Sequence, residues 1–233
     1  MQAAQPLQLA WKEPESHEKP YNLDTFTKFF EQHSELKVVY IQWLDYFGTL
    51  RARMMPIAGF RRLITNGERI GISLGNTGTL QNDRVTPAVS SAGQIYVEPD
   101  ISTLRVTHSR DPLASATVMG SFCNEDGRHS NCCPRNTLRF LIDRFSNDHQ
   151  ITLLAGFEIE VVFLKQDPNG QYSPWTTNHA WGTFTPEQFE VAFPVLAEIA
   201  DELANIGIDV QQFHSESGAG QYEFVLPPLP ILE

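Results

Sequence analysis

The sequence has few cysteines, no long apolar run and no apolar core near its start, and each of these features excludes a class of protein. It contains three cysteines, an odd number, so a complete set of intramolecular disulfides is excluded. No apolar run approaches the length that a transmembrane helix needs. Residues 1–20 are polar and contain prolines, without the apolar core of a signal peptide, and we expect them to be a disordered lead-in. Together these features predict a cytoplasmic protein with no membrane partner.

Basic residues are also scarce. The chain carries 17 Lys and Arg against 28 Asp and Glu, for a net charge of −11. A nucleic-acid partner is not expected, because the phosphate backbone binds to basic surfaces. Hydrophobic residues, by contrast, make up 41% of the 233 residues and include 15 Phe and 4 Trp. This content predicts a folded globular protein with a substantial core.

The pattern in the first half of the chain predicts a small mixed sheet with one or two helices. An apolar spacing of three and four predicts a helix over residues 23–30, and β-branched and aromatic runs predict strands. The remaining expected elements are strands 38–44 and 49–54 around a turn at 45–48, a helix over 60–66 closed by Gly67, mostly loop over 71–93, and strands 95–98, 103–106 and 116–123.

The second half predicts longer helices and fewer strands. Thr185 is expected to cap a helix, because Pro186 occupies its first turn and Gln188 completes a capping box. Pro194 is expected to kink this helix and Gly207 to end it. The other expected elements are a helix from Pro134, a long strand region over 151–165, a turn at 168–170, an aromatic loop over 171–184, and strands 208–214 and 221–226.

Four glutamates stand out in this half of the chain. Glu158 and Glu160 are separated by one residue on a strand, so their side chains project from the same face. Glu216 and Glu223 flank a turn that contains glycines, which let a backbone approach a ligand. The Glu158–Glu160 pattern alone also fits a solvated strand edge. Carboxylates this dense repel one another unless a cation lies among them, so all four together predict a Mg²⁺ or Mn²⁺ site.

The spacing of these glutamates resembles the glutamine synthetase family. The matching motif is Gly156-x-Glu158-x-Glu160, then His214-x-Glu216, six residues and Glu223, with Gly220-Gln221 just before the last glutamate. Three further segments resemble the family, namely residues 39–48, residues 99–104 and Pro134-Arg135-x-x-Leu138. The resemblance covers roughly residues 22–228, and its character is that of the type I-like synthetases of fungi.

The resemblance implies an α+β fold in two parts. A small β-grasp domain over residues 21–112 is followed by the first part of an antiparallel β half-barrel with flanking helices over residues 113–233. The implied function is an ATP-dependent ligase, which joins ammonia or another amine to the γ-carboxylate of glutamate through γ-glutamyl phosphate. Members of the family form oligomers whose sites are shared between subunits, so a completed protein is expected to be a homo-oligomer.

The resemblance also implies roles for individual residues. Glu160, Glu216 and Glu223 would hold one divalent metal, and Glu158 would contribute to a second beside the transferring phosphate. Asp45 would help to bind and deprotonate ammonium from across a subunit interface. The family's later His-x-His strand, its substrate loop and its substrate-gripping arginines have no counterpart here, so a fragment that is inactive alone is expected. The alternative is a truncated, non-catalytic protein that binds metal or docks onto a full-length relative.

Several weaker patterns allow other interpretations. Cys123, His129, Cys132 and Cys133 suggest zinc, but adjacent cysteines suit a tetrahedral site poorly, so reduced thiols are the plainer interpretation. The glycines of residues 71–78 lack the lysine of a phosphate-binding loop, so a surface loop is expected. Trp175 and Trp181 either rim a nucleotide site or pack in a core, and the sequence leaves both interpretations open. His214 is interpreted as a polar neighbour that orients a ligand carboxylate.

Overall fold

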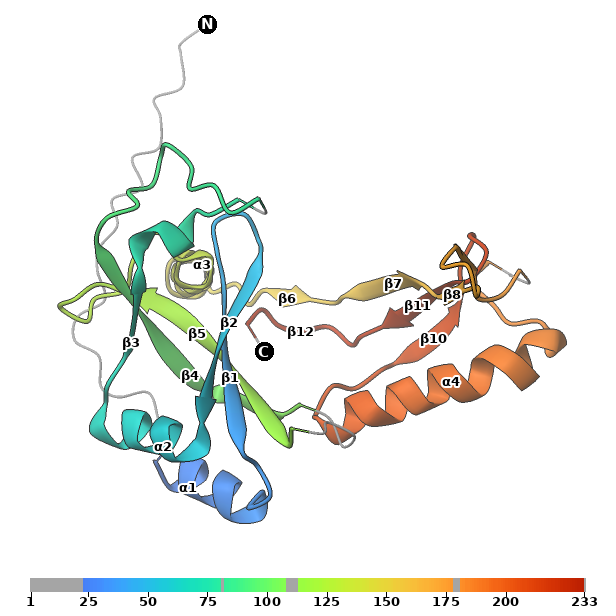
Figure 1. Ribbon diagram of the computed structural model, residues 1–233, viewed down its shortest axis with the longest axis horizontal. Helices are drawn as coiled ribbons and strands as arrows, with labels where there is room; N and C mark the ends of the chain where they lie inside the picture. The colour runs from blue at the N-terminus through green and yellow to red at the C-terminus, as the bar shows by residue number, and fades with distance from the viewer. Residues whose placement is uncertain (1–22, 81, 108–112, 178–180, 233) are drawn as a thin grey trace, which may run out of the picture. The chain divides into compact units, whose positions relative to one another are not determined.

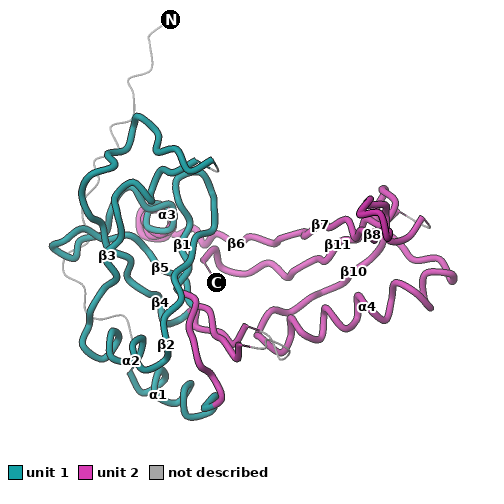
Figure 2. Tube along the Cα trace, in the orientation of Figure 1, with its two compact units in different colours: residues 1–34, 41–102, 118–137 teal, residues 35–40, 103–117, 138–233 magenta. Residues whose placement is uncertain are grey.

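The computed structural model describes residues 23–80, 82–107, 113–177 and 181–232. The chain divides into two compact units (Figures 1 and 2). Unit 1 comprises residues 1–34, 41–102 and 118–137, and unit 2 comprises residues 35–40, 103–117 and 138–233. The expected lead-in at residues 1–20 lies outside the described residues. The expected domain boundary between residues 112 and 113 stays a prediction, as does the β-grasp assignment.

A five-stranded sheet with the order β2-β1-β5-β4-β3 dominates the first part of the chain. Strand β1 alternates half-buried and buried positions, as expected of a strand with one face in a core, and Ile41 and Trp43 are buried. The elements are α1 (Leu23–Gln32), β1 (Val38–Leu44), β2 (Leu50–Pro56), α2 (Ile57–Asn66), β3 (Ile70–Ser73), a 3₁₀ helix (Leu74–Thr77), β4 (Gln94–Val106) and β5 (Ser115–Cys123).

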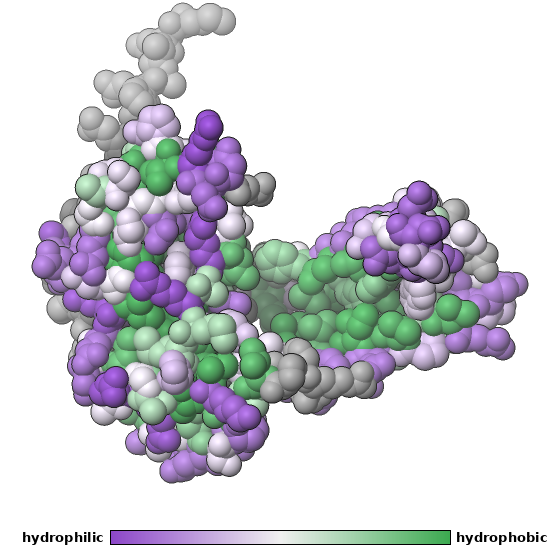
Figure 3. All heavy atoms as spheres, in the orientation of Figure 1, coloured by the Kyte–Doolittle hydropathy of each residue, from purple (hydrophilic) through white to green (hydrophobic). Residues whose placement is uncertain are grey.

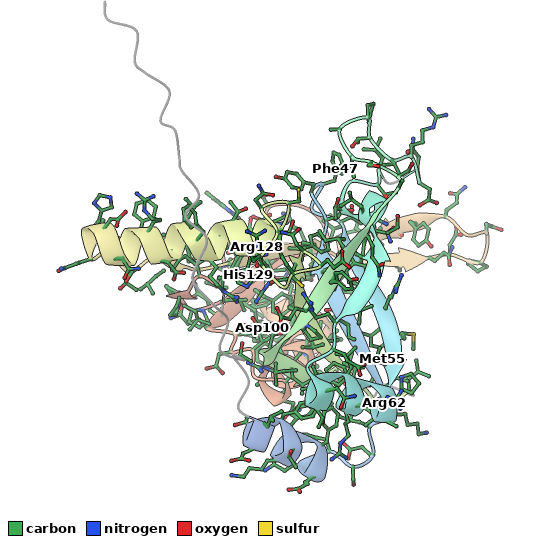
Figure 4. All side chains as sticks on the ribbon, turned by 90° about the vertical axis from the view of Figure 1, so that its left-hand side faces the viewer. Phe47, Met55, Arg62, Asp100, Arg128 and His129 are labelled. Carbon is green, nitrogen blue, oxygen red and sulfur yellow. The ribbon has the colours of Figure 1, made fainter. Side chains whose placement is uncertain are left out.

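Both N-terminal helices contribute aromatic side chains to the core of unit 1. The rings of Phe26 and Phe30 lie 5.2 Å apart at an angle of 72°, and each also contacts Phe60 of α2. Gly67 ends α2 with a φ of 66°, a left-handed conformation that favours glycine, as the sequence predicted. Phe47 and Met55 lie at opposite ends of the edge strand β2, with Arg62 of α2 near Met55 (Figure 4).

Residues 71–93 are mostly loop, as predicted, although Ile70–Ser73 at their start forms β3 and pairs antiparallel with the start of β4. Another prediction for the first part was wrong. The two short strands expected around Pro99 form one strand of 13 residues, β4. Proline lacks the backbone N–H that a sheet ladder uses, yet Pro99 lies within this strand.

A three-stranded antiparallel sheet, in the order β10-β11-β7, carries the second part of the chain. Tyr222 and Phe224 of β11 form the buried core of unit 2 with Ala192 and Leu196 of the long helix α4. The elements are α3 (Pro134–His149), β6 (Leu154–Ala155), β7 (Glu158–Val162), β8 (Leu164–Gln166), β9 (Tyr172–Pro174), α4 (Pro186–Asn205), β10 (Gln212–Ser215), β11 (Gln221–Val225) and β12 (Leu229–Pro230).

The two ends of α4 match the sequence prediction and the kink at Pro194 stays a prediction, whereas the strands around the helix are shorter than predicted. Thr185 and Gln188 form the expected capping box, and the backbone N–H of Thr185 donates to Gln188 Oε1 over 2.8 Å. The region 151–165 contains three short strands instead of one, because β6, β7 and β8 pair with three different partners. The expected strand 208–214 begins only at Gln212, and Trp175 is a packing residue whose ring contacts Tyr222 and Phe163.

Unit 2 exposes many apolar side chains, which gather over α4 and the strands beside it on the face shown in Figure 3. They include Leu154, Phe157, Val162, Leu164, Phe189, Val191 and Phe193. Among the described residues, no helix is both long and apolar enough to cross a membrane. The arrangement of helices and sheets confirms the predicted α+β class.

Candidate metal centre

The register of the three-stranded sheet brings the predicted acidic residues onto one face. His214 of β10, Glu223 of β11 and Glu160 of β7 are direct neighbours in one row across the strands. Glu158 lies two residues further along β7 and therefore projects from the same face. The opposite face carries Tyr222 and packs against α4, so the sheet separates an apolar core from a row of acidic groups.

Two of the predicted glutamates and a histidine form a compact group of possible metal ligands. One ligand atom each from His214, Glu216 and Glu223 lies within 4.8 Å of the other two. His214 Nδ1 is 3.9 Å from Glu216 Oε1. Glu223 is 8% exposed and Glu216 is 9% exposed, so both carboxylates are largely shielded from water. Within the described ranges this is the one such group of three or more His, Cys, Asp or Glu residues.

A tight turn sets the position of Glu216. The backbone N–H of Glu216 donates to the carbonyl of Gln221 over 2.9 Å, and the N–H of Gln221 donates to the carbonyl of Gly218 over 3.0 Å. Gly220 closes the turn with a φ of 71°, and a Cβ there would lie 2.8 Å from the carbonyl oxygen of Phe163. A larger residue at position 220 is therefore excluded by both conformation and contact.

Glu158 and Glu160 lie outside the compact group. The carboxylate of Glu160 accepts a hydrogen bond of 2.6 Å from the side-chain amide of Gln221. Glu158 is paired with Val225 in the register and is exposed. The sequence therefore predicted the shared face of Glu158 and Glu160, but not His214 as a possible ligand or Gln221 as a partner of Glu160. The signal for His214 was its spacing of two from Glu216.

The local electrostatics favour a bound cation. The pKa of Glu223 is raised, first because the carboxyl group is removed from water and further because Glu158, Glu216 and Glu160 lie nearby, while His214 lowers it. A buried carboxylate that is repelled by its neighbours gains from a cation placed among them. The donor set of carboxylate oxygens with one imidazole suits a hard divalent ion such as Mg²⁺ or Mn²⁺. The residues of this site therefore fit the predicted metal.

The same part of the chain matches a known sequence family. Residues 131–232 match the family described as glutamine synthetase, catalytic domain. The chain carries part of a glutamine synthetase family catalytic domain. The glutamates of the site and the turn between them all lie inside the matched residues.

Individual relatives support this membership. Protein fluG of Emericella nidulans is 41% identical over 210 residues, which are 88% of this chain and 24% of that protein. A γ-glutamylpolyamine synthetase of Streptomyces coelicolor is 28% identical over 79% of this chain and 39% of its own length. A solved glutamine synthase homologue superposes with a TM-score of 0.64 at 24% identity, over 83% of this chain and 44% of its own. The chain thus spans less than half of each of these proteins.

Asp45, the other predicted site residue, lies in unit 1 and is held by its own hairpin. Its side chain is 0% exposed. Oδ1 accepts hydrogen bonds of 2.9 Å from the backbone N–H groups of Phe47 and Thr49, and Oδ2 accepts one of 2.7 Å from Arg51 Nε. Arg51 also donates to the carbonyl of Thr79 over 2.7 Å. These contacts are those of a residue that fixes a turn, and a role in binding ammonium stays a prediction.

Replacing Asp45 by asparagine is expected to lower the free energy of unfolding by about 2 kcal/mol, because the buried pair with Arg51 loses its charge. Urea denaturation followed by circular dichroism measures this loss. The matched control is Asp126→Asn, which removes an exposed pair with Arg128 and should leave stability nearly unchanged. If Asp45→Asn is as stable as the wild type, the turn does not depend on this carboxylate.

The structure does not support the two other ligand sites that the sequence suggested, a zinc site at the cysteines and a phosphate-binding loop at residues 71–78. Cys123 and Cys133 are buried, and Cys132 is exposed. Burial raises the pKa of the Cys123 thiol, and Arg69 Nη1 lies 3.5 Å from its sulfur. These cysteines do not form a group of possible metal ligands within the described residues. The glycine-containing segment 71–78 forms β3 and the 3₁₀ helix instead of a phosphate-binding loop.

Proposed function

We propose that this chain supplies the metal-binding half of the active site of a glutamine synthetase-like ligase. The completed enzyme would join ammonia or another amine to the γ-carboxylate of glutamate, with ATP as co-substrate and γ-glutamyl phosphate as intermediate, in the cytoplasm. The observation that carries the proposal is the compact group of His214, Glu216 and Glu223 inside the matched catalytic-domain region. Because the Streptomyces relative is described as a γ-glutamylpolyamine synthetase, the proposal does not specify which amine is joined to glutamate.

In this proposal the residues of the site bind two metal ions. Glu160, Glu216 and Glu223 hold one Mg²⁺ or Mn²⁺, with His214 beside them, and Glu158 contributes to a second ion. Divalent ions at such a site neutralise charge on the phosphate oxygens during phosphoryl transfer. The protein's own part would be to hold Glu160 and Glu223 on neighbouring strands and Glu216 in the turn between β10 and β11.

The chain alone is not expected to catalyse turnover. ATP and glutamate are both anionic, and phosphoryl transfer depends on cationic side chains that grip the moving group. From residue 145 to the end, the sequence contains a single lysine, Lys165, and no arginine. The relatives are more than twice as long as the segment that matches them, so we propose that these cations, and the subunit contacts of a homo-oligomer, belong to sequence beyond this segment.

A non-catalytic role is the second candidate. The exposed apolar residues of unit 2 offer a large apolar surface, and β7 lies at one edge of its three-stranded sheet. Such a surface favours docking onto a longer relative. In this role the chain would still bind a divalent metal and would have no ligase activity of its own.

The ligase proposal is tested by completing the chain. A fusion of residues 1–233 with the remaining catalytic domain of a glutamine synthetase relative is expected to form γ-glutamyl hydroxamate from glutamate, ATP and hydroxylamine. The unfused chain is expected to release no phosphate. Glu216→Gln in the fusion serves as the control and should remove at least about 99% of the activity, since a direct metal ligand is lost. A folded, metal-loaded fusion that forms no hydroxamate would favour the non-catalytic candidate.

A further inference from the structure

The side chain of Gln221 makes two different hydrogen bonds at the centre of the acidic face. Its Oε1 accepts a hydrogen bond of 2.9 Å from the backbone N–H of Gly218, inside the turn that carries Glu216. Its Nε2 donates a hydrogen bond of 2.6 Å to Glu160 Oε2 on the neighbouring strand β7. One amide group therefore joins the turn of one candidate ligand to the carboxylate of another.

The two partners fix the orientation of this amide. An N–H group can only donate and an ionised carboxylate can only accept, so a flipped amide would bring two donors together at Gly218 and two acceptors together at Glu160. The contact with Glu160 has an ionised acceptor, and charge-assisted hydrogen bonds of this kind are shorter and stronger than neutral ones. Gln221 thus restricts a carboxylate that is otherwise exposed on an outer strand of its sheet.

The hydrogen bond from Gln221 holds one particular oxygen of the Glu160 carboxylate. Gln221 lies opposite Val162 in the strand pairing, while Glu160 lies opposite Glu223 one row further along the same face. The amide engages Oε2 of Glu160, so Oε1 is the oxygen that takes no part in this hydrogen bond. Without this bond the Glu160 side chain would move away from the other carboxylates, because like charges repel and water is available on its open side.

We propose that Gln221 is a positioning residue for the metal site. It holds Glu160 by one oxygen so that the other is available to a divalent cation bound by the group of His214, Glu216 and Glu223. This inference rests on the proposed function, since it requires that group to bind a metal. Hydrogen bonds from a second layer of residues orient metal ligands in the same way in other proteins, and their loss weakens metal binding by about 10- to 100-fold.

The test is a double-mutant cycle on Mn²⁺ affinity, measured by titration calorimetry with the 233-residue chain. Gln221→Met keeps the size and neutral charge of the side chain and removes both hydrogen bonds, and it is expected to weaken Mn²⁺ binding by about 10-fold. In a Glu160→Gln background the same substitution is expected to cause a clearly smaller further loss, because only its hydrogen bond with Gly218 is then removed. Gln212→Met, on the same face of the sheet, is the matched control and should bind Mn²⁺ as the wild type does.

Nuclear magnetic resonance keeps the inference testable if Gln221→Met folds poorly. The side-chain amide signals of Gln221 in the otherwise unmodified chain are expected to shift on addition of Mg²⁺, and to shift in the Glu160→Gln variant without metal. Three results would overturn the proposal. The first is wild-type Mn²⁺ affinity in Gln221→Met, and the second is an equal loss of Mn²⁺ affinity in both backgrounds. The third is that the Gln221 amide signals shift neither on addition of Mg²⁺ nor in the Glu160→Gln variant. If Glu223→Gln abolishes binding while the Gln221 variant behaves as wild type, only this inference fails. If the wild type binds no Mn²⁺, the proposed function fails with it.

Discussion

Tyr222→Ala is expected to lower the free energy of unfolding by about 3–5 kcal/mol, the range for removing a large side chain from a core. Tyr222 is 0% exposed, and its ring lies 5.9 Å from that of Phe163, 6.1 Å from that of Trp175 and 6.4 Å from that of Phe184. A loss of this size is a large part of the stability of a typical domain. Because Tyr222 directly precedes Glu223 on β11, the row of acidic groups depends on the same packing.

The matched control for this prediction is Tyr222→Phe. It keeps the ring and removes only the hydroxyl group, which lies 2.9 Å from the hydroxyl of Thr176. The expected loss is about 1 kcal/mol, the net value of one ordinary hydrogen bond. Urea denaturation followed by tryptophan fluorescence measures both variants, since Trp175 contacts the substituted ring. Equal losses in the two variants would mean that the hydroxyl, and not the ring, supports the sheet.

Glu223→Gln is expected to weaken Mn²⁺ binding by at least about 100-fold, the upper end of the effect seen when residues that only support a metal ligand are lost. The same change is expected to leave the metal-free protein equally stable or more stable at neutral pH. Burial and the neighbouring carboxylates raise the pKa of Glu223. The stability linked to its protonated form is present below the unfolded-state pKa and is lost as the pH rises through the raised folded-state pKa. Glutamine cannot ionise, so it avoids this loss.

Calorimetry with Mn²⁺ and thermal unfolding without metal measure the two parts of this prediction. Glu190→Gln is the control, because it makes the same change of charge at an exposed position on α4. It should alter neither metal affinity nor stability. A Glu223→Gln variant that binds Mn²⁺ like the wild type would remove this carboxylate from the ligand set, and one that unfolds at room temperature would show that the carboxylate has a structural role.

Local signals in the sequence predicted parts of the fold well. The start of α4 follows from Thr185 and Gln188, whose capping contacts lie within three residues of each other. The end of α2 follows from Gly67, which adopts the left-handed conformation. The shared face of Glu158 and Glu160 follows from the period of two in a strand. Each of these features depends only on neighbours along the chain.

Features that depend on pairing between distant segments were missed. The strand β4 continues through Pro99, which lies beyond the Gln94–Val97 segment that pairs with β3. Region 151–165 breaks into three strands because each pairs with a different partner, which no local pattern reveals. The contact between Gln221 and Glu160 joins residues 61 positions apart. The sequence therefore indicated which residues matter to the site, while the register of the strands decides which of them meet.

The central claim is that this chain carries a divalent metal site at His214, Glu216 and Glu223. Electron spin-echo spectroscopy of Mn²⁺ added to the 233-residue chain tests it most directly. The account predicts one protein-bound Mn²⁺ whose spectrum contains a ¹⁴N modulation from the imidazole of His214, lost in His214→Gln. A spectrum of fully hydrated Mn²⁺ alone, at millimolar concentrations of metal and of folded protein, would contradict it.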